Sequence, residues 1–362
     1  MDLIEKLKNE TIKTKGISAS DALELFIEGS DNPFRVMAAS SQIREHFKGK
    51  DIILCGITNA KSGKCSEDCK FCAQSSHYPT DAPSYPLKTA TEMIAEADDA
   101  VRSGAEFFGI VTSGKRIKAK KEWNEIFKAV KGINKTGIKA CASLGLIDTE
   151  KAKELKTAGL SRYHHNLETS RSFFKNICTT HDYEANVETI RIVKKAGLSV
   201  CAGALFGMGE GITHRIELAA TLRELNVDSV PINILNPIKG TPLSHMLPLP
   251  PLEILMTIAV FRFMLPDKDI KLCGGKEKNL RQLLPLGIMA GANSLMTGNY
   301  LTTTGRDSKL DQEMIADLGL IPTREADYCN CNAERGNSRL SPKKVKRKAV
   351  NVKSAATRPQ KK

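Results

Sequence analysis

Apolar and polar residues follow two different rhythms along the chain. Over the first 48 residues the apolar positions have helical spacing, and Leu3, Ile4 and Leu7 form a short stripe. The stretch 18–30 begins with a serine that can cap a helix and ends in Gly-Ser. From residue 51 onward, short β-like runs alternate with amphipathic stretches. This change predicts an N-terminal helical extension over residues 1–48 and a larger α/β domain after it.

Eight β-like runs, each followed by a helix-like stretch, make up the region from residue 49 to 322. Several helical stretches end in Ala-Gly or Ser-Gly, which is typical of helix C-termini. Regular alternation of strand and helix predicts a parallel sheet with crossover helices. Eight units in roughly 270 residues fit a (β/α)8 TIM-type barrel, with a doubly wound open sheet as the alternative. The runs are 51–58, 106–112, 138–145, 161–168, 198–207, 228–235, 269–275 and 292–298.

The C-terminal region loses this periodicity. Residues 323–340 contain Cys329 and Cys331 as a C-x-C pair, and residues 341–362 hold nine Lys or Arg and no acid. Low hydrophobicity with one sign of charge predicts a disordered tail. The whole chain carries +13, so the tail leaves only +4 for the other 340 residues. The basic balance is therefore not evidence that the main domain binds nucleic acid.

The N-terminus has no uninterrupted apolar segment of the kind found in signal peptides. Nor does any run approach the roughly 18 apolar residues of a membrane span. We therefore expect a cytoplasmic protein with no membrane partner, whose ten cysteines are reduced. Clustered cysteines in such a protein indicate metal ligands or catalysts rather than disulfides.

Three cysteines, Cys65, Cys69 and Cys72, lie in the loop directly after the first predicted strand, with spacing C-x3-C-x2-C. Active sites of (β/α)8 barrels lie at this end of the strands. Structural zinc sites usually use two C-x2-C pairs, and no second pair lies nearby. Three thiolates can instead hold three irons of a [4Fe–4S] cluster and leave the fourth open to a ligand from outside the protein. A zinc loop or a set of inert thiols is the alternative.

This spacing, with Phe71 before the last cysteine, resembles the signature of radical S-adenosylmethionine (SAM) enzymes. In that family the open iron binds SAM, and the reactive radical comes from the cofactor, so no catalytic side chain is expected. Further stretches resemble the biotin synthase family. They are 64–78, 163–170, 230–235, 239–243 and 289–304.

The resemblance implies a radical SAM sulfurtransferase that inserts sulfur between C6 and C9 of dethiobiotin. It also implies a homodimer and an electron donor such as flavodoxin or ferredoxin. By the same resemblance, Asn166 and Glu168 contact the nucleoside of SAM. The expected substrate-binding residues are His164, which replaces the family's usual Asn, Asn233, Thr303 and Thr304. The alternative roles are helix capping for the Asn166–Glu168 pair and a turn for the threonines.

The family also holds a second, [2Fe–2S] cluster, whose ligands are three strand cysteines and an arginine. Cys141 and Cys201 match two of these ligands, but Gly109 replaces the third cysteine and Lys271 replaces the arginine. Glycine offers no ligand, and an ammonium group is a poor substitute for a guanidinium group at a shaped site. We therefore do not expect the family's usual four-ligand cluster.

Cys273 follows Lys271 by two residues, so the two side chains share one face of the strand. If that face lines the barrel, Cys273 can join Cys141 and Cys201, and Cys329 or Cys331 can add a ligand. We predict an auxiliary iron–sulfur cluster of a different kind, with four irons and a sacrificial sulfide, near Lys271. Alternatively, Cys273 is a small buried residue and the C-x-C pair a surface zinc or redox site. Cys55 and Cys178 are assigned no role.

Two rival functions remain. Hydrogenase maturases and methylornithine synthases are radical enzymes on the same barrel, and loss of the usual second cluster favours them slightly. An RNA-binding or RNA-modifying role is suggested by the basic tail, which supplies nonspecific phosphate attraction. No aromatic and basic platform for RNA accompanies the tail, so we do not expect a nucleic-acid partner.

Overall fold

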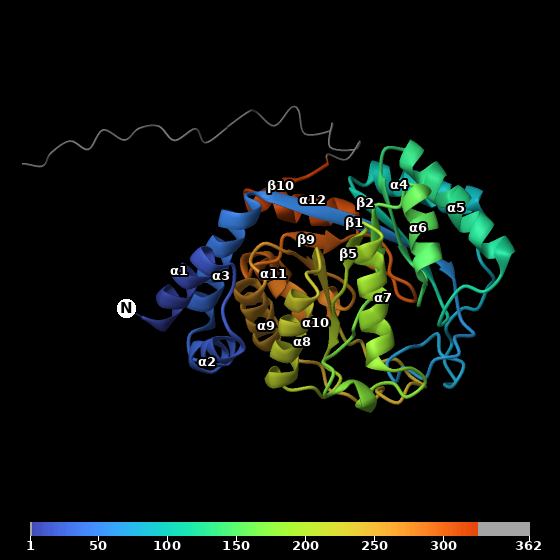
Figure 1. Ribbon diagram of the computed structural model, residues 1–362. Helices are drawn as coiled ribbons and strands as arrows, with labels where there is room; N and C mark the ends of the chain where they lie inside the picture. The colour runs from blue at the N-terminus through green and yellow to red at the C-terminus, as the bar shows by residue number, and fades with distance from the viewer. Residues whose placement is uncertain (1, 325–362) are drawn as a thin grey trace, which may run out of the picture. The chain divides into compact units, whose positions relative to one another are not determined.

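The computed structural model describes residues 2–324, and within them the predicted barrel is present (Figure 1). All pairings between neighbouring strands are parallel, and the last strand pairs with the first, which closes the sheet. Each of the eight predicted runs forms a strand, and the fifth is divided into β5 and β6. The closed barrel is confirmed and the open-sheet alternative is wrong. The barrel strands are β1 (Asp51–Lys61), β2 (Phe107–Thr112), β3 (Lys139–Ser143), β4 (Arg162–His164), β5 (Ser199–Cys201), β6 (Ala204–Phe206), β7 (Ser229–Ile234), β8 (Asp269–Leu272) and β9 (Ser294–Met296).

Helices cover the outside of the barrel, and several of them turn an apolar face toward the strands. In α5, for example, Trp123, Ile126 and Ile133 are buried at helical spacing. Helix α4 begins with a capping box, in which Thr89 and Glu92 satisfy each other's backbone N–H groups. The crossover helices and short helices after β1 are α4 (Ala90–Arg102), α5 (Lys120–Lys135), α6 (Thr149–Thr157), η1 (Phe174–Asn176), α7 (Tyr183–Lys195), α8 (Ile212–Glu224), α9 (Pro251–Met264), α10 (Lys276–Leu280), η2 (Arg281–Leu283), α11 (Leu284–Met289) and α12 (Ser308–Asp317).

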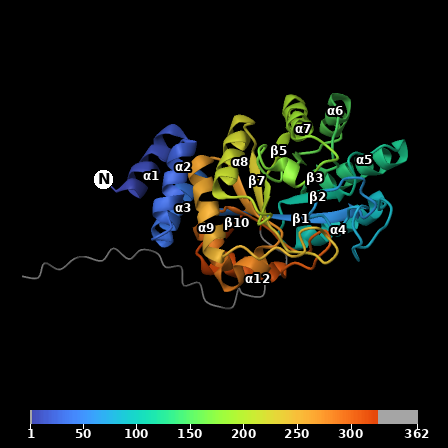
Figure 2. The same cartoon turned by 90° about the horizontal axis from the view of Figure 1, so that it is seen from below.

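Three helices precede the barrel in the described N-terminal part, as predicted: α1 (Leu3–Thr14), α2 (Ala19–Gly29) and α3 (Pro33–Lys48). Helices α2 and α3 pack against α9, and Figure 2 shows them on its outer side. Helix α9 is therefore enclosed between the barrel and the extension. Every residue from 254 to 264 is buried, which explains why this helix is apolar all round.

A short strand that the sequence did not predict, β10 (Ile321–Pro322), pairs with the start of β1. The predicted boundaries at residues 48 and 322 remain predictions. Apart from residues 323 and 324, the predicted Cys-containing segment and the basic tail lie outside the described residues. Within residues 2–324, the structure contains no helix long and apolar enough to span a membrane.

Candidate functional site

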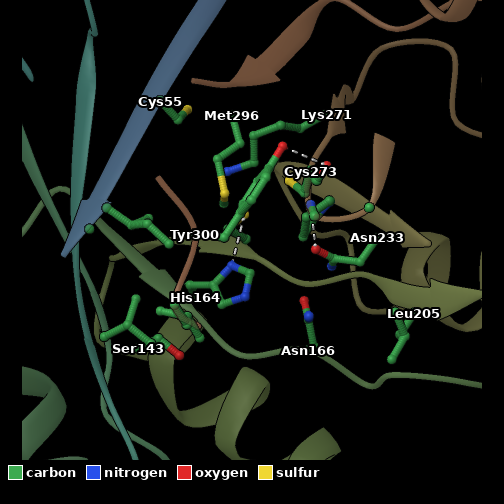
Figure 3. Close-up of a pocket in the computed structure, with 18 of the residues that line it drawn as sticks. Cys55, Ser143, His164, Asn166, Leu205, Asn233, Lys271, Cys273, Met296 and Tyr300 are labelled. Atoms are coloured by element: carbon green, nitrogen blue, oxygen red, sulfur yellow. Dashed lines mark hydrogen bonds between the residues drawn. The ribbon is translucent and has the colours of Figure 1, made fainter. Parts of the chain in front are cut away.

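A cavity of about 350 Å³ runs along the inside of the barrel, from side chains deep among the strands to the loops that follow them. It is lined by alternate strand residues, such as Gly109 and Val111 of β2 and Lys271 with Cys273 at the end of β8. The face of β8 that carries Lys271, with Cys273 just beyond it, therefore lines the interior of the barrel. Figure 3 shows how side chains from several strands converge on this space.

The cysteine loop lies after β1, as predicted. Backbone hydrogen bonds fold it tightly: the Cys72 N–H donates to the Cys69 carbonyl (2.9 Å), and the Cys65 N–H donates to that of Gln74 (3.0 Å). Cys65, Cys69 and Cys72 are all partly exposed, and Phe71 of the same loop lines the cavity. Burial raises the pKa of the Cys72 thiol to about 11, and the negative charges of Cys65 and Glu168 add to this effect. Three soft sulfur donors beside a cavity fit three irons of a four-iron cluster.

A second segment, residues 177–181, holds this loop in place. The Asp68 carboxylate accepts hydrogen bonds from the backbone N–H groups of Thr179 (2.8 Å) and Thr180 (3.1 Å). Glu67 accepts a bond from His181 at 2.6 Å. Burial opposes the charge of Asp68, but these hydrogen bonds outweigh it and hold the pKa of Asp68 well below its usual range. Sequence reasoning missed this contact, although the paired acids within the cysteine motif were a usable signal.

Cys178 belongs to the same segment, and its Sγ atom lies 3.8 Å from Cys69 Sγ. It is buried, outside the residues that line the cavity. The sequence assigned it no role. The structure places it behind the cysteine loop, where Glu67, Cys178 and His181 also bring their polar atoms within 4.8 Å of one another.

The predicted SAM-binding pair lies directly after β4. Asn166 Oδ1 accepts a bond from the Gly203 N–H (3.1 Å), and Asn166 Nδ2 donates to Glu168 Oε2 (3.4 Å). Glu168 has a left-handed φ of 64°, held by two backbone hydrogen bonds to Gly203 and Leu205. Both side chains line the cavity, and burial raises the pKa of Glu168 to about 7. The structure therefore brings the pair together and faces it toward the cysteine loop.

The predicted substrate residues divide into two groups. His164, Asn233 and Thr303 line the cavity, whereas Thr304 is not among its described lining residues. Asn233 is fixed by two bonds: its Oδ1 accepts from the Gly274 N–H (3.0 Å), and its Nδ2 donates to the Ala204 carbonyl (3.0 Å). Each of these atoms keeps one further hydrogen-bonding position for a ligand.

A buried lysine beside this region was not predicted. Lys276 is fully buried, and its Nζ atom donates to Tyr300 Oη (2.7 Å), the Met296 carbonyl (2.8 Å) and Glu277 Oε1 (2.5 Å). Tyr300 lies across the cavity in Figure 3. The network fixes the ring of Tyr300 beside Thr303. The sequence carried no signal for it, because it depends on contacts between helix α10 and the end of β9 with the loop that follows it.

Deeper in the cavity, the three predicted auxiliary-cluster cysteines come together. Cys141, Cys201 and Cys273 all line the cavity and are buried, as is Lys271. Cys55, to which the sequence analysis assigned no role, lines the cavity too. Its apolar neighbours on β1 hid the fact that its side chain faces inward. Cys329 and Cys331 lie outside the described residues.

Cationic side chains and cysteines lie side by side at the base of the cavity. Burial opposes the charge of Lys271, but the thiols of Cys201, Cys55 and Cys273 outweigh this effect and raise its pKa. Burial likewise opposes ionisation of Cys201, but Lys271, His164 and Arg162 together lower the pKa of Cys201 to about 5. His164 Nδ1 lies 3.3 Å from Cys201 Sγ, so this predicted substrate residue also contacts the cysteine group. Thiolates with cations beside them suit an anionic iron–sulfur cluster.

Solved structures share this fold. A crystal structure of methylornithine synthase matches with a TM-score of 0.75 and 22% identity, covering 89% of this chain and 98% of that one. The FeFe-hydrogenase maturase of Carboxydothermus hydrogenoformans matches with a TM-score of 0.73 and 16% identity, covering 88% and 79%. At these identities the matches establish the barrel fold.

Sequence comparisons are more specific. The model of the radical SAM superfamily matches residues 60–222, and that of the biotin and thiamin synthesis associated domain matches residues 231–321. A biotin synthase of Geotalea uraniireducens is 51% identical over 88% of this chain and 97% of its own length. That of Geobacter sulfurreducens is 52% identical over 87% and 96%. The chain therefore belongs to the biotin synthase family of radical SAM enzymes.

Proposed function

We propose that this protein inserts sulfur between C6 and C9 of dethiobiotin to form biotin. The observation that carries the proposal is the continuous cavity, which adjoins the three-cysteine loop at one end and holds buried cysteines at the other. A radical generator and a sulfur source must both reach one substrate, and this cavity offers a place between them. The family uses a [4Fe–4S] cluster, SAM and an auxiliary iron–sulfur cluster, in agreement with the two groups of thiols.

Cys65, Cys69 and Cys72 would hold the [4Fe–4S] cluster. When bound, cluster and SAM supply the adenosyl radical that removes hydrogen from the substrate. Asn166 and Glu168 would orient the SAM nucleoside, because an ionised carboxylate can accept both ribose hydroxyls. Phe71 would separate the loop from solvent by covering this end of the cavity.

Dethiobiotin would lie between the two groups of thiols. We assign its ureido ring to Asn233, whose amide can both donate and accept, with His164 beside it. Thr303 would contact the carboxylate, and the Lys276–Tyr300 network would hold the loop that carries Thr303. Thr304 remains a weaker candidate because it is not among the lining residues.

The sulfur source in this proposal is an auxiliary cluster on Cys141, Cys201 and Cys273, with Lys271 as a neighbouring cation. Cys329 or Cys331 remains a candidate for a further ligand. The wider proposal includes a homodimer, an electron donor such as flavodoxin or ferredoxin, and a reducing cytoplasmic location, which free thiols and iron–sulfur clusters favour. It does not include a nucleic-acid partner.

Anaerobic turnover tests this function. We expect reconstituted protein supplied with dethiobiotin, SAM and a reductant to form biotin and 5′-deoxyadenosine. Biotin without any added sulfide source would support a sulfur donor within the protein. Cleavage of SAM with no biotin formed would contradict the proposal and favour a different radical reaction on the same barrel.

Iron analysis tests the auxiliary cluster separately. We expect iron and acid-labile sulfide per chain to exceed clearly what one [4Fe–4S] cluster contains. A content equal to that of the first cluster alone, with biotin formation intact, would eliminate the auxiliary cluster as the sulfur source.

A further inference from the structure

The register of the barrel strands places cysteines from three strands in one layer. In a (β/α)8 barrel with a shear of 8, a layer contains inward side chains from alternate strands, and its height shifts by one residue at each strand. The strand pairs are Cys55↔Phe107, Phe108↔Ala140, Cys141↔Arg162, Tyr163↔Val200, Cys201↔Ser229, Val230↔Ile270, Lys271↔Ser294 and Leu295↔Leu54. The path goes from each residue to its partner on the next strand and then advances by one residue along that strand. Repeated once around the barrel, it returns to Cys55. The layer is therefore Cys55, Cys141, Cys201 and Lys271.

Cys273 lies two residues beyond Lys271, on the same inward face. Three of the cysteines thus belong to one layer, and the fourth belongs to the second layer above it. Four thiolates that do not lie in one plane suit a four-iron cluster, whereas a square-planar arrangement would suit other metals.

Gly109 offers no side chain between these layers, and the space for one is tight. A Cβ atom placed there would lie 3.2 Å from Ile57 Cγ2 and 4.0 Å from Cys141 Cβ, at the edge of the cavity. The family's ligand from this strand is thus missing immediately beside Cys141. Cys55 comes from the adjacent strand, and it packs in one cluster with Phe107 and Cys141.

The Cys55 side chain makes few polar contacts. It is 3% exposed, and its Sγ atom has one weak polar neighbour, Ser294 Oγ at 3.9 Å. An inert buried cysteine would be expected among apolar groups alone. Cys55 instead shares a layer with two cysteines and a buried lysine.

The charges at this place also fit a bound cluster. Four thiolates on an oxidised four-iron cluster give a net charge of about −2. Lys271 and Arg162 are buried beside the cysteines and supply two positive charges. Asp269 contacts Arg162 (3.4 Å), but it also pairs with Lys48 at 3.0 Å, which balances its charge. Cations placed beside the cysteines in this way would partly balance the negative charge of a bound cluster.

We propose that Cys55 is the fourth ligand of the auxiliary cluster, which this chain holds on Cys55, Cys141, Cys201 and Cys273. The assignment rests on the auxiliary cluster of the proposed function. The family takes one ligand from β2, where this chain has Gly109. In this assignment the corresponding ligand comes from the neighbouring strand β1. The assignment also completes the site within the barrel, with no ligand taken from Cys329 or Cys331.

The test isolates the auxiliary site by removing the first cluster. The parent protein carries C65A, C69A and C72A, and is reconstituted with iron and sulfide without oxygen. Iron, acid-labile sulfide and the Mössbauer spectrum are then measured for this parent and for the added substitution C55A. We expect the parent to hold about four irons per chain, and C55A to fall below about half of that content. C141A should behave like C55A.

Two further variants serve as controls. C178A removes another buried cysteine that lies outside the cavity, and it should keep the parent's iron content. The double substitution C329A/C331A should also keep it. Loss of iron in C329A/C331A with full retention in C55A would overturn the proposal, and so would a parent that binds no iron.

If C55A fails to fold, as judged by circular dichroism, iron content and the Mössbauer spectrum are measured for C55S instead. A serine oxygen can replace the thiolate, so we expect retained iron with an altered Mössbauer spectrum. An unchanged spectrum would overturn the assignment. Biotin formation by the protein with all cysteines intact is measured in parallel, so that failure of this ligand assignment can be told from failure of the proposed function.

Discussion

Glu168 combines an unusual backbone conformation with an unusual pKa of its carboxyl group. Its left-handed φ of 64° is uncommon for a residue with a side chain, and it persists because Gly203 and Leu205 hold both backbone polar groups. The carboxyl group is thereby fixed in the cavity, where burial raises its pKa to about 7. Binding sites frequently contain a titratable group whose pKa is shifted by burial in this way.

The raised pKa makes the charged form of Glu168 costly above neutral pH. A carboxyl group whose pKa rises on folding from 4.5 to about 7 stabilises the folded state fully below pH 4.5, and this contribution is lost as the pH rises through 7. In cofactor-free protein, we expect Glu168→Gln to raise the melting temperature by about 2 °C or more at pH 8, and much less at pH 5. Scanning fluorimetry measures both. Equal changes at the two pH values would contradict the assigned cost.

The three loop cysteines give a second prediction at this scale. Because each thiol would hold one iron, we expect Cys69→Ala to lower SAM cleavage by at least about 100-fold and to remove iron from the protein. Formation of 5′-deoxyadenosine under reducing conditions measures the loss. Lys70→Ala, in the same loop, is the control and should retain most activity. Full cleavage by the Cys69 variant would refute the cluster assignment.

Long-range hydrogen bonds join two loop segments at the site. The cysteine loop and the segment 177–181 are about 110 residues apart in the chain, yet Asp68 binds two successive backbone N–H groups of that segment. Charge-assisted hydrogen bonds of this kind are stronger than neutral ones. The cysteine loop is thus fixed to the segment that precedes α7.

Removing the Asp68 carboxylate should release this segment. Each charge-assisted hydrogen bond contributes about 1.5–3 kcal/mol, so we expect Asp68→Ala to speed amide exchange at Thr179 and Thr180 by at least about tenfold. Hydrogen–deuterium exchange with mass spectrometry measures the rate. Asp81→Ala, an exposed aspartate after the same loop, should leave the rate unchanged. No change in the Asp68 variant would show that other contacts hold the segment.

At the scale of the whole described molecule, the periodicity of the sequence predicted the architecture. Eight strands and the helical extension were predicted because alternation and helical spacing are local properties of the chain. The division of the fifth run into β5 and β6, and the pairing of β10 with β1, depend on partners distant in the sequence. They could not be predicted from local pattern.

The site was predicted less completely for the same reason. Spacing alone identified Cys65, Cys69 and Cys72, whereas the relation of Cys55 to Cys141 depends on strand register. Register is set by packing around the whole barrel, and no short segment records it. The Lys276–Tyr300 network likewise joins helix α10 to the loop after β9. A motif thus predicted the candidate residues that lie in one loop, and the structure was needed for those that meet across the barrel.

The enclosure of α9 gives a prediction for overall stability. Ile43 lies fully buried on α3, which packs against α9. Truncating a buried isoleucine leaves a cavity, so Ile43→Ala should lower the free energy of unfolding by about 2–4 kcal/mol. Urea denaturation measures this value. Glu45→Ala, exposed on the same helix, should change it by less than about 0.5 kcal/mol. A loss as small for Ile43 would mean that the extension contributes little to the barrel.

The layered interior of the barrel has a consequence for how such a site changes over time. Neighbouring strands present side chains at almost the same height, so a ligand lost from one strand can be replaced from the next by a single substitution, with the backbone untouched. Related proteins can then keep the same fold while the metal-binding residue changes from one strand to its neighbour. Column-by-column alignment would record such a move as a loss, whereas the three-dimensional register records it as a transfer.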